Sequence, residues 1–140
     1  MNSIIIFTDG GSRGNPGEAA IGIFITNKNN EILAKIGKRI GVDTNNVAEY
    51  KAVIEALNWL LSNKGLASQY DSIKFYTDSQ LVFSQLSGVF KVKNETIRNL
   101  VFTVNKKKEE LGISISWEHI PRGKNHEADL LVNLALDNLL

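Results

Sequence analysis

Near the start of the sequence, residues 3–8, SIIIFT, are followed directly by residues 9–17, DGGSRGNPG. The first stretch is short, apolar at consecutive positions and rich in β-branched side chains, which is typical of a strand buried on both faces of a sheet. The second stretch contains four glycines and a proline, so it predicts a loop that begins at Asp9. The chain therefore starts on a predicted central strand with a carboxylate at its end.

Strand and helix patterns alternate in the rest of the sequence. Two strand-like runs, 19–26 and 31–40, flank the polar residues 27–30, which predicts a hairpin. Apolar side chains then recur at helical spacing over 46–62. The later elements are predicted as a strand at 71–77, helices at 79–86 and around 97–111, a strand at 113–120 and a helix at 125–139. This order predicts an α/β fold with a mixed five-stranded sheet, three antiparallel strands followed by two parallel ones, and helices on both faces.

Length and composition narrow the classes of protein. A chain of 140 residues suits a single domain, predicted here as 1–140. The absence of cysteine excludes a disulfide framework, a thiolate zinc site and a cysteine nucleophile. No apolar run reaches bilayer length and residues 1–7 lack the features of a signal peptide, so the expected location is the cytoplasm, away from membranes. With a formal net charge of +1, phosphate binding must come from locally placed charges, helix dipoles or metal ions.

Three aspartates occupy positions where a carboxylate is informative. Asp9 and Asp78 each follow a predicted strand, and strand ends are common places for active-site groups in α/β folds. Asp129 lies in the first turn of the last predicted helix, where the helix dipole favours a negative charge. Each has an ordinary alternative when taken alone, namely a turn former or helix cap for the first two and dipole compensation for the third.

A fourth acid, Glu49, is predicted to point toward the sheet. On a helix it shares a face with Val53 and Leu60, whereas Glu55 shares a face with polar side chains. An inward charge costs several kcal/mol unless a cation or a hydrogen-bond donor satisfies it. Together with the three aspartates, Glu49 predicts a carboxylate cluster for a hard cation such as Mg²⁺ or Mn²⁺, which suits two-metal phosphoryl transfer.

Four short motifs occur in order along the chain. They are residues 8–12 (TDGGS) with 14–17 (GNPG), 44–49 (TNNVAE), 77–80 (TDSQ) and 125–129 (NHEAD). In this combination the sequence resembles type 1 ribonuclease H, the RNase HI family, and the resemblance covers nearly the whole chain. It implies a ribonuclease H-like fold and an endonuclease that hydrolyses the RNA strand of an RNA–DNA hybrid. The implied products carry 5′-phosphate and 3′-hydroxyl ends.

The resemblance also implies a catalytic centre. The implied catalytic and metal-binding acids are Asp9, Glu49, Asp78 and Asp129, which would hold two Mg²⁺ ions, with Mn²⁺ as a substitute. One ion would activate the attacking water and the other would stabilise the leaving 3′ oxygen. The implied partner is the hybrid duplex, bound by a monomer.

Five polar residues are implied to contact the hybrid. Residues matching Asn15, Asn46 and Gln80 contact the RNA strand in this family and read its 2′-hydroxyls through the minor groove. Residues matching Thr44 and Asn45 hold the DNA strand, the threonine at a phosphate. Contact with 2′-hydroxyls is the expected basis for distinguishing RNA from DNA.

The sequence departs from the best-known bacterial form in two places. The segment 88–94 (GVFKVKN) is short and resembles variants that lack the basic protrusion. Lys91 and Lys93 within it are expected either to give a reduced substrate contact or to be ordinary connector residues. The loop before Asp129 is also short and lacks a histidine at the family's flexible-loop position. Arg122 lies nearest to that position and is expected to contact the scissile phosphate.

Three alternative functions fit parts of the pattern. A DNA nuclease or integrase-like domain of the same fold needs only the acid cluster, but Thr44, Asn45 and Asn46 favour hybrid binding. A binding module without catalysis is disfavoured because all four acids are present. A sugar-kinase-like phosphate-binding domain is suggested by Asp9 and the glycines after it, but it would require a longer chain.

Overall fold

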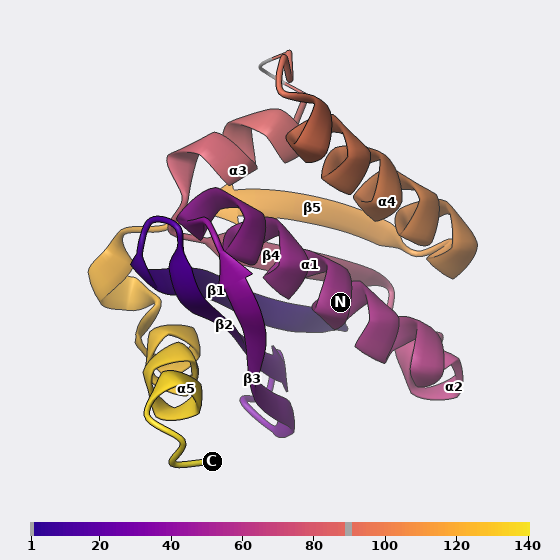
Figure 1. The fold of residues 1–140 in the computed structure, drawn as a ribbon. Coiled ribbons are helices and arrows are strands. Elements are labelled where there is room, and N and C mark those ends of the chain that lie inside the picture. Colours follow the sequence, from indigo (N-terminus) through magenta and orange to yellow (C-terminus); the bar gives the residue numbers. More distant parts are fainter. Residues whose placement is uncertain (1, 89–90) are drawn as a thin grey trace.

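The computed structural model describes residues 2–88 and 91–140, and its centre is a sheet in the order β3-β2-β1-β4-β5. The strands are β1 (Ser3–Gly14), β2 (Gly17–Asn27), β3 (Ile32–Asp43), β4 (Ser72–Thr77) and β5 (Ser114–His119). The first three pair antiparallel, whereas β4 pairs parallel with β1 and β5 pairs parallel with β4 (Figure 1). The predicted mixed sheet is therefore confirmed.

The helices cover both faces of this sheet, as predicted (Figure 1). They are α1 (Asn45–Ser62), α3 (Gln80–Leu86), α4 (Glu95–Leu111) and α5 (His126–Leu136). Helix α1 packs on β1 and on α4, and α5 packs on β2 and β3 from the other side. Two short elements were not predicted: α2 (Lys64–Ala67) and the 3₁₀ turn η1 (Arg122–Lys124). None of the described helices is long and apolar enough to cross a membrane.

Two glycines let the helices lie close to the sheet. A Cβ atom at Gly10 would lie 2.3 Å from the backbone carbon of Ala48 in α1. A Cβ atom at Gly22 would lie 2.1 Å from the carbonyl oxygen of Ala128 in α5. Both distances are far shorter than real Cβ contacts allow, so these two positions require glycine. The first close approach brings the N-terminal turn of α1 against β1, beside Asp9.

The loop predicted for residues 9–17 was wrong. Strand β1 continues through these residues to Gly14 and pairs with β2 as far as Gly17, so only a tight turn separates the two strands. The antiparallel partner satisfies the backbone groups that a loop would expose to water, and this tertiary pairing outweighs the loop preference of glycine. Asp9 consequently lies inside a strand rather than at its end. Helix α5 also ends at Leu136, earlier than the predicted residue 139.

The main core lies between the sheet and α1. Ile4, Ile6, Ile23, Leu57 and Phe75 in this core are each exposed by no more than 1%. Close packing of this kind resists small displacements, so the sheet edge beside α1 is a rigid support. Met1 and residues 89–90 lie outside the described residues, and with them part of the two predictions for the segments 1–7 and 88–94.

Candidate metal centre and nucleic-acid interface

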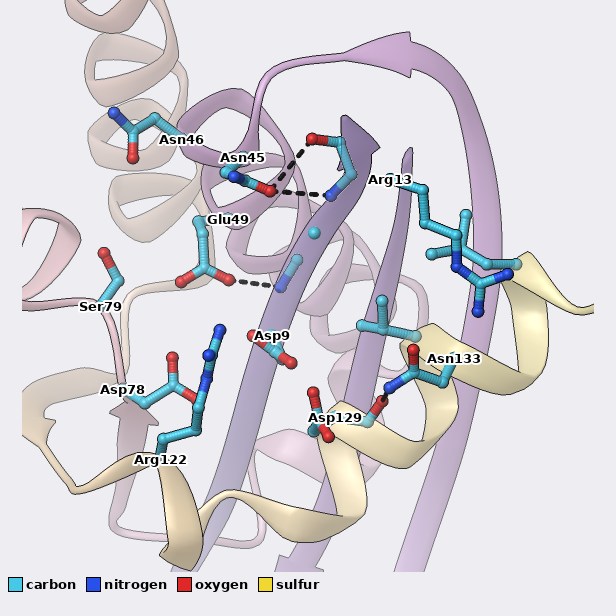
Figure 2. A pocket seen from close by; sticks show the side chains of 15 residues that line it. Asp9, Arg13, Asn45, Asn46, Glu49, Asp78, Ser79, Arg122, Asp129 and Asn133 are labelled. Carbon is cyan, nitrogen blue, oxygen red and sulfur yellow. Dashed lines mark hydrogen bonds between the residues drawn. The ribbon is translucent and has the colours of Figure 1, made fainter. Parts of the chain in front are cut away.

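Three carboxylates converge at one edge of the sheet. Asp9, Glu49 and Asp78 each offer a carboxylate oxygen, and these oxygens all lie within 4.8 Å of one another (Figure 2). Asp9 and Glu49 are buried, and Asp78 is partly buried. Three carboxylates this close repel one another in the absence of a cation.

Strand pairing explains why the two aspartates meet. The parallel register of β1 and β4 ends at Thr8 opposite Thr77. Asp9 and Asp78 directly follow this last pair along the chain, so they lie next to each other. Asp78 lies in the two-residue connection to α3, whose N-cap is Ser79. The prediction that two strand-linked aspartates are neighbours is confirmed, although β1 itself continues.

Glu49 reaches the aspartates from α1. The N–H group of Gly10 donates a hydrogen bond to Glu49 Oε1, which ties the first turns of this helix to β1. The side chain of Thr44 caps the helix by accepting a hydrogen bond from the N–H of Val47 at 3.2 Å. The predicted inward orientation of Glu49 is confirmed, since only 8% of the residue is exposed. Glu55 is confirmed as an outer residue, with its side chain 34% exposed beside Lys38.

Burial and mutual repulsion change the acidity of this cluster. Burial, and then the negative charge of Asp78, raises the pKa of Asp9 to about 7. Burial, and then the charge of Asp9, raises the pKa of Glu49 well above its usual range. Among the residues described here, the ion pairs involve none of the four predicted acids. A divalent cation would therefore relieve a real electrostatic cost, and the oxygen-only donors suit Mg²⁺ or Mn²⁺.

Asp129 lies next to this trio rather than inside it. It comes from the first turn of α5 and lines the same pocket, of about 470 Å³, as Asp9 (Figure 2). Its negative charge contributes to the raised pKa of Asp9. The structure therefore brings all four predicted acids to one pocket but gathers only three within 4.8 Å.

Asn125 is a residue of this site whose role the sequence did not reveal. Its Nδ2 donates hydrogen bonds to the carbonyl oxygen of Thr8 at 2.9 Å and to Asp78 Oδ2 at 3.1 Å. It is 1% exposed and makes no side-chain cap for α5, although an asparagine before a helix usually predicts a cap. The only available signal was its place in the 125–129 motif. Asn125 holds Asp78 against β1.

The predicted substrate residues near α1 form a hydrogen-bonded platform. Asn15 Oδ1 accepts a hydrogen bond from the N–H of Asn45 at 3.0 Å. Asn45 Oδ1 in turn accepts from the N–H and the hydroxyl of Ser12, at 2.8 and 3.0 Å. Asn45 and Asn46 both line the pocket with the acids, and Arg122 borders it from the other side (Figure 2). Asn45, Asn46 and Arg122 therefore share one pocket with the carboxylates, whereas Asn15 supports Asn45 from outside the pocket lining.

The remaining predicted substrate residues lie outside the pocket. Gln80 is exposed at the start of α3, where its Nε2 donates to Ser84 Oγ at 3.1 Å. Lys91 and Lys93 are exposed in the connection between α3 and α4. The pocket lining contains other polar residues that the sequence did not single out, namely Arg13, Ser79 and Asn133.

The fold and the site together define a class: an α/β domain with a cluster of acidic side chains where the parallel pairing of β1 and β4 ends. A family model described as "Reverse transcriptase-like" matches residues 7–135. The chain is 39% identical over 134 residues to ribonuclease HI of Halobacterium salinarum, covering 94% of this chain. It is 31% identical over 157 residues to ribonuclease H of Ruthia magnifica, covering 99% of each chain. The chain belongs to the ribonuclease H family.

A solved structure agrees with this assignment. LC11-RNase H1, isolated from compost by a metagenomic approach, superposes with a TM-score of 0.92 at 43% identity, covering 99% of this chain and 98% of that one. The same relative has also been solved in complex with an RNA/DNA hybrid, with a TM-score of 0.89. The chain spans 63% of the length of the Halobacterium protein and 35% of the length of a related bifunctional protein of Mycobacterium tuberculosis.

Proposed function

We propose that this chain is an endoribonuclease that hydrolyses the RNA strand of RNA–DNA hybrids, leaving 5′-phosphate and 3′-hydroxyl ends. The observation that carries the proposal is the convergence of Asp9, Glu49 and Asp78 within 4.8 Å, beside the platform of Asn45. The hybrid bound by LC11-RNase H1 supports the choice of substrate. The family and the site point to the same chemistry.

In this proposal Asp9, Glu49, Asp78 and Asp129 hold two Mg²⁺ ions, and Mn²⁺ substitutes for them. Divalent cations at such a site supply Lewis-acid stabilisation of the charge that develops on a phosphate. The chain's own part is orientation: Gly10 fixes the Glu49 carboxylate and Asn125 fixes that of Asp78. Side chains held in this way lose little entropy when they engage a cation, which favours tight and selective binding.

The substrate contacts follow from the same placement. Asn15 and Asn46 are assigned to the RNA strand with Gln80, and Thr44 and Asn45 to the DNA strand. An amide side chain both donates and accepts hydrogen bonds, so it can pair with a 2′-hydroxyl that DNA lacks. Of these residues, Asn45 and Asn46 line the same pocket as the acids.

Three basic side chains are assigned to phosphates. Arg122 borders the pocket and is placed at the scissile phosphate. Lys91 and Lys93 are exposed beyond α3 and give weaker contacts farther along the duplex, in place of a basic protrusion. Because they do not line the pocket that holds the acids, we assign them to substrate affinity rather than to the chemical step.

The proposal takes residues 1–140 as one catalytic domain that acts as a monomer in the cytoplasm. The continuous five-stranded sheet, which joins the first and last strands of the chain through shared neighbours, supports the single domain. Sedimentation velocity at assay concentration checks the monomer. A stable dimer would contradict that part of the proposal without affecting the reaction.

The experiment is cleavage of matched RNA–DNA, DNA–DNA and RNA–RNA duplexes with Mg²⁺, read as labelled products of each strand. We expect cuts in the RNA strand of the hybrid and in neither strand of the DNA–DNA duplex, with products that ligate through a 5′-phosphate. Equal cleavage of the DNA–DNA duplex would instead identify a DNA nuclease of the same fold. No cleavage of any duplex would reject the enzymatic proposal.

A further inference from the structure

An aromatic patch lies on the sheet face opposite α1. We define it as Phe7 of β1, Phe24 of β2 and Tyr76 of β4, which are direct neighbours in the strand register. The rings of Phe7 and Tyr76 stack with centroids 5.0 Å apart and an interplanar angle of 15°. Phe24 lies 6.3 Å from Phe7 at an angle of 41°. All three are partly buried, so a part of each residue reaches the solvent.

A hollow borders this patch. It has a volume of about 110 Å³ and is lined by Phe7 and Phe24 on the sheet and by Lys124, His126 and Glu127 at the start of α5. Its walls combine two aromatic rings with groups that donate or accept hydrogen bonds. Such a combination fits a flat heteroaromatic ring with polar edges better than it fits an aliphatic group.

Lysine side chains surround the rings. Lys35 Nζ lies 5.6 Å from the centroid of Phe24, and Lys74 Nζ lies 5.9 Å from that of Tyr76. Lys74 also pairs with Glu118 at 3.4 Å, whereas Lys35 and Lys124 form no ion pair with the residues described in the structure. Lys35 and Lys124 are exposed, so each ammonium group is free to turn toward a phosphate. The patch therefore combines aromatic rings with the exposed ammonium groups of Lys35 and Lys124, and the carboxylate of Glu127 also lines the hollow.

The patch is continuous with the metal centre. Phe7 and Asp9 are two residues apart in β1, so both side chains leave the sheet on the same face, about 7 Å apart along the strand. The segment 122–129 borders both sites: Arg122 and Asp129 line the metal pocket, whereas Lys124 and its neighbours line the hollow. Stacked nucleotides rise about 3.4 Å each, so roughly two nucleotides cover the distance between the two sites.

From these observations we infer that the aromatic patch binds unpaired nucleotides that extend from the end of the substrate duplex, with one base stacked in the hollow. The inference rests on the proposed function only in taking the duplex as the substrate. Aromatic stacking binds any base, and the lysines bind the backbone, so the site accepts single-stranded DNA and RNA alike. Charge selects this occupant over a second apolar protein surface, because Lys35 and Lys124 would lose water without gaining a partner there.

The test compares a blunt hybrid with hybrids that carry a short unpaired extension on either strand, one of DNA and one of RNA. Binding is measured by fluorescence anisotropy in EDTA, so that cleavage plays no part. We expect an extension to tighten binding about tenfold, within the range known for one stacked base, and Phe24→Leu to remove that gain. Phe24→Leu keeps an apolar side chain against the sheet, and the blunt hybrid should be bound and cleaved as before.

The matched control is Phe102→Leu. Phe102 is 67% exposed on α4 and has Lys106 Nζ 6.0 Å from its ring centroid, so it reproduces an aromatic–lysine pair away from the patch. Phe102→Leu should leave the tighter binding of the extended hybrid unchanged.

A second variant, Lys35→Gln with Lys124→Gln, changes only exposed residues and should reduce the log–log salt slope of extension binding by up to about 0.7 for each phosphate released. This variant keeps the test decisive if Phe24→Leu does not fold.

Each outcome decides for or against the patch. The inference would be overturned if the extension did not tighten binding, or if the tighter binding persisted in both patch variants. It would also be overturned if Phe102→Leu removed the tighter binding. A dimer in sedimentation velocity that Phe24→Leu dissociates would overturn it too, by assigning the patch to a second copy of the chain. Failure to cleave the blunt hybrid would reject the proposed function alone, because extension binding is measured without cleavage.

Discussion

Glu49 and Glu55 lie on the same helix, but their surroundings are opposite. Glu49 is 8% exposed and shares its site with two aspartates, whose negative charges repel its own. Glu55 has a side chain 34% exposed, and its charge is compensated by Lys38 Nζ at 3.4 Å. The difference shows that helix position, rather than residue type, determines whether a carboxylate is a surface group or part of a strained acidic centre.

Removal of the metal should have the largest effect on cleavage and on stability, and it should act through Glu49 and not through Glu55. Since the three convergent carboxylates repel one another, Mg²⁺ should raise the melting temperature of the protein, and excess EDTA should abolish hybrid cleavage. Cleavage assays and thermal melts with and without EDTA measure both effects. Full activity in excess EDTA would end the metal-centre account, whatever the melts show.

Asp78→Asn should be nearly as severe for activity. The substitution keeps the shape of the side chain and its contact with Asn125 while removing one charge from the centre. We expect the hybrid cleavage rate to fall at least ~10²-fold with the fold intact, since the lost charge positions the metal that stabilises the transition state. Near-normal cleavage by a folded Asp78→Asn protein would exclude Asp78 as a ligand.

The metal-free protein should lose stability as pH rises. Asp9 has a pKa of about 7 in the folded state against an ordinary value of 3.8, so the folded state binds more protons than the unfolded state between these values. Stability in EDTA should therefore fall from about pH 4 to about pH 7, by at most on the order of 4 kcal/mol, and the raised pKa of Glu49 should extend the loss to higher pH.

Denaturant melts in EDTA across this pH range, compared between wild type and Asp9→Asn, isolate the effect from that of other groups. The variant should show a shallower fall because one of the coupled acids no longer titrates. Identical pH dependence in the two proteins would mean that Asp9 is not held in the repulsive cluster described for it.

The smallest effect is expected at the exposed connection beyond α3. Lys91→Ala combined with Lys93→Ala should raise KM for the hybrid between roughly twofold and thirtyfold, since exposed charge contacts contribute about 0.2–1 kcal/mol each. The catalytic rate constant should change less, because these contacts are equal in the ground and transition states. Steady-state kinetics at fixed salt measures both constants. An unchanged KM would make the two lysines ordinary connector residues.

Much of this architecture could be predicted from periodicity. The alternation of strands and helices and the inward phase of Glu49 both follow from spacing alone, and the structure agrees with them. The glycine-rich residues 9–17 could not be predicted correctly, because their strand conformation depends on pairing with β2 and on close contact with two helices. Local preference favours a loop there, and tertiary contacts outweigh it.

The acids of the site could be predicted from the sequence, but the residues that hold them in place by hydrogen bonds could not. Asn125 escaped notice because a residue before a helix predicts a cap, whereas its side chain joins Thr8 of β1 to Asp78 after β4, which are distant in sequence. The hydrogen bond from Gly10 to Glu49 is equally long-range, since it joins residues in different elements. Contacts of this kind depend on the packing of the sheet against α1 and α5, which no local pattern encodes.

The most direct test of the central claim is a paired measurement on Glu49→Gln and Glu55→Gln, with melting in EDTA and hybrid cleavage in Mg²⁺. Glutamine at position 49 keeps an acceptor for Gly10 and removes a repelled charge, so melting should be unchanged or higher while cleavage is lost. Glu55→Gln should cleave normally and shift stability by no more than about 0.5 kcal/mol. Normal cleavage by Glu49→Gln, or loss of cleavage in Glu55→Gln, would contradict the account.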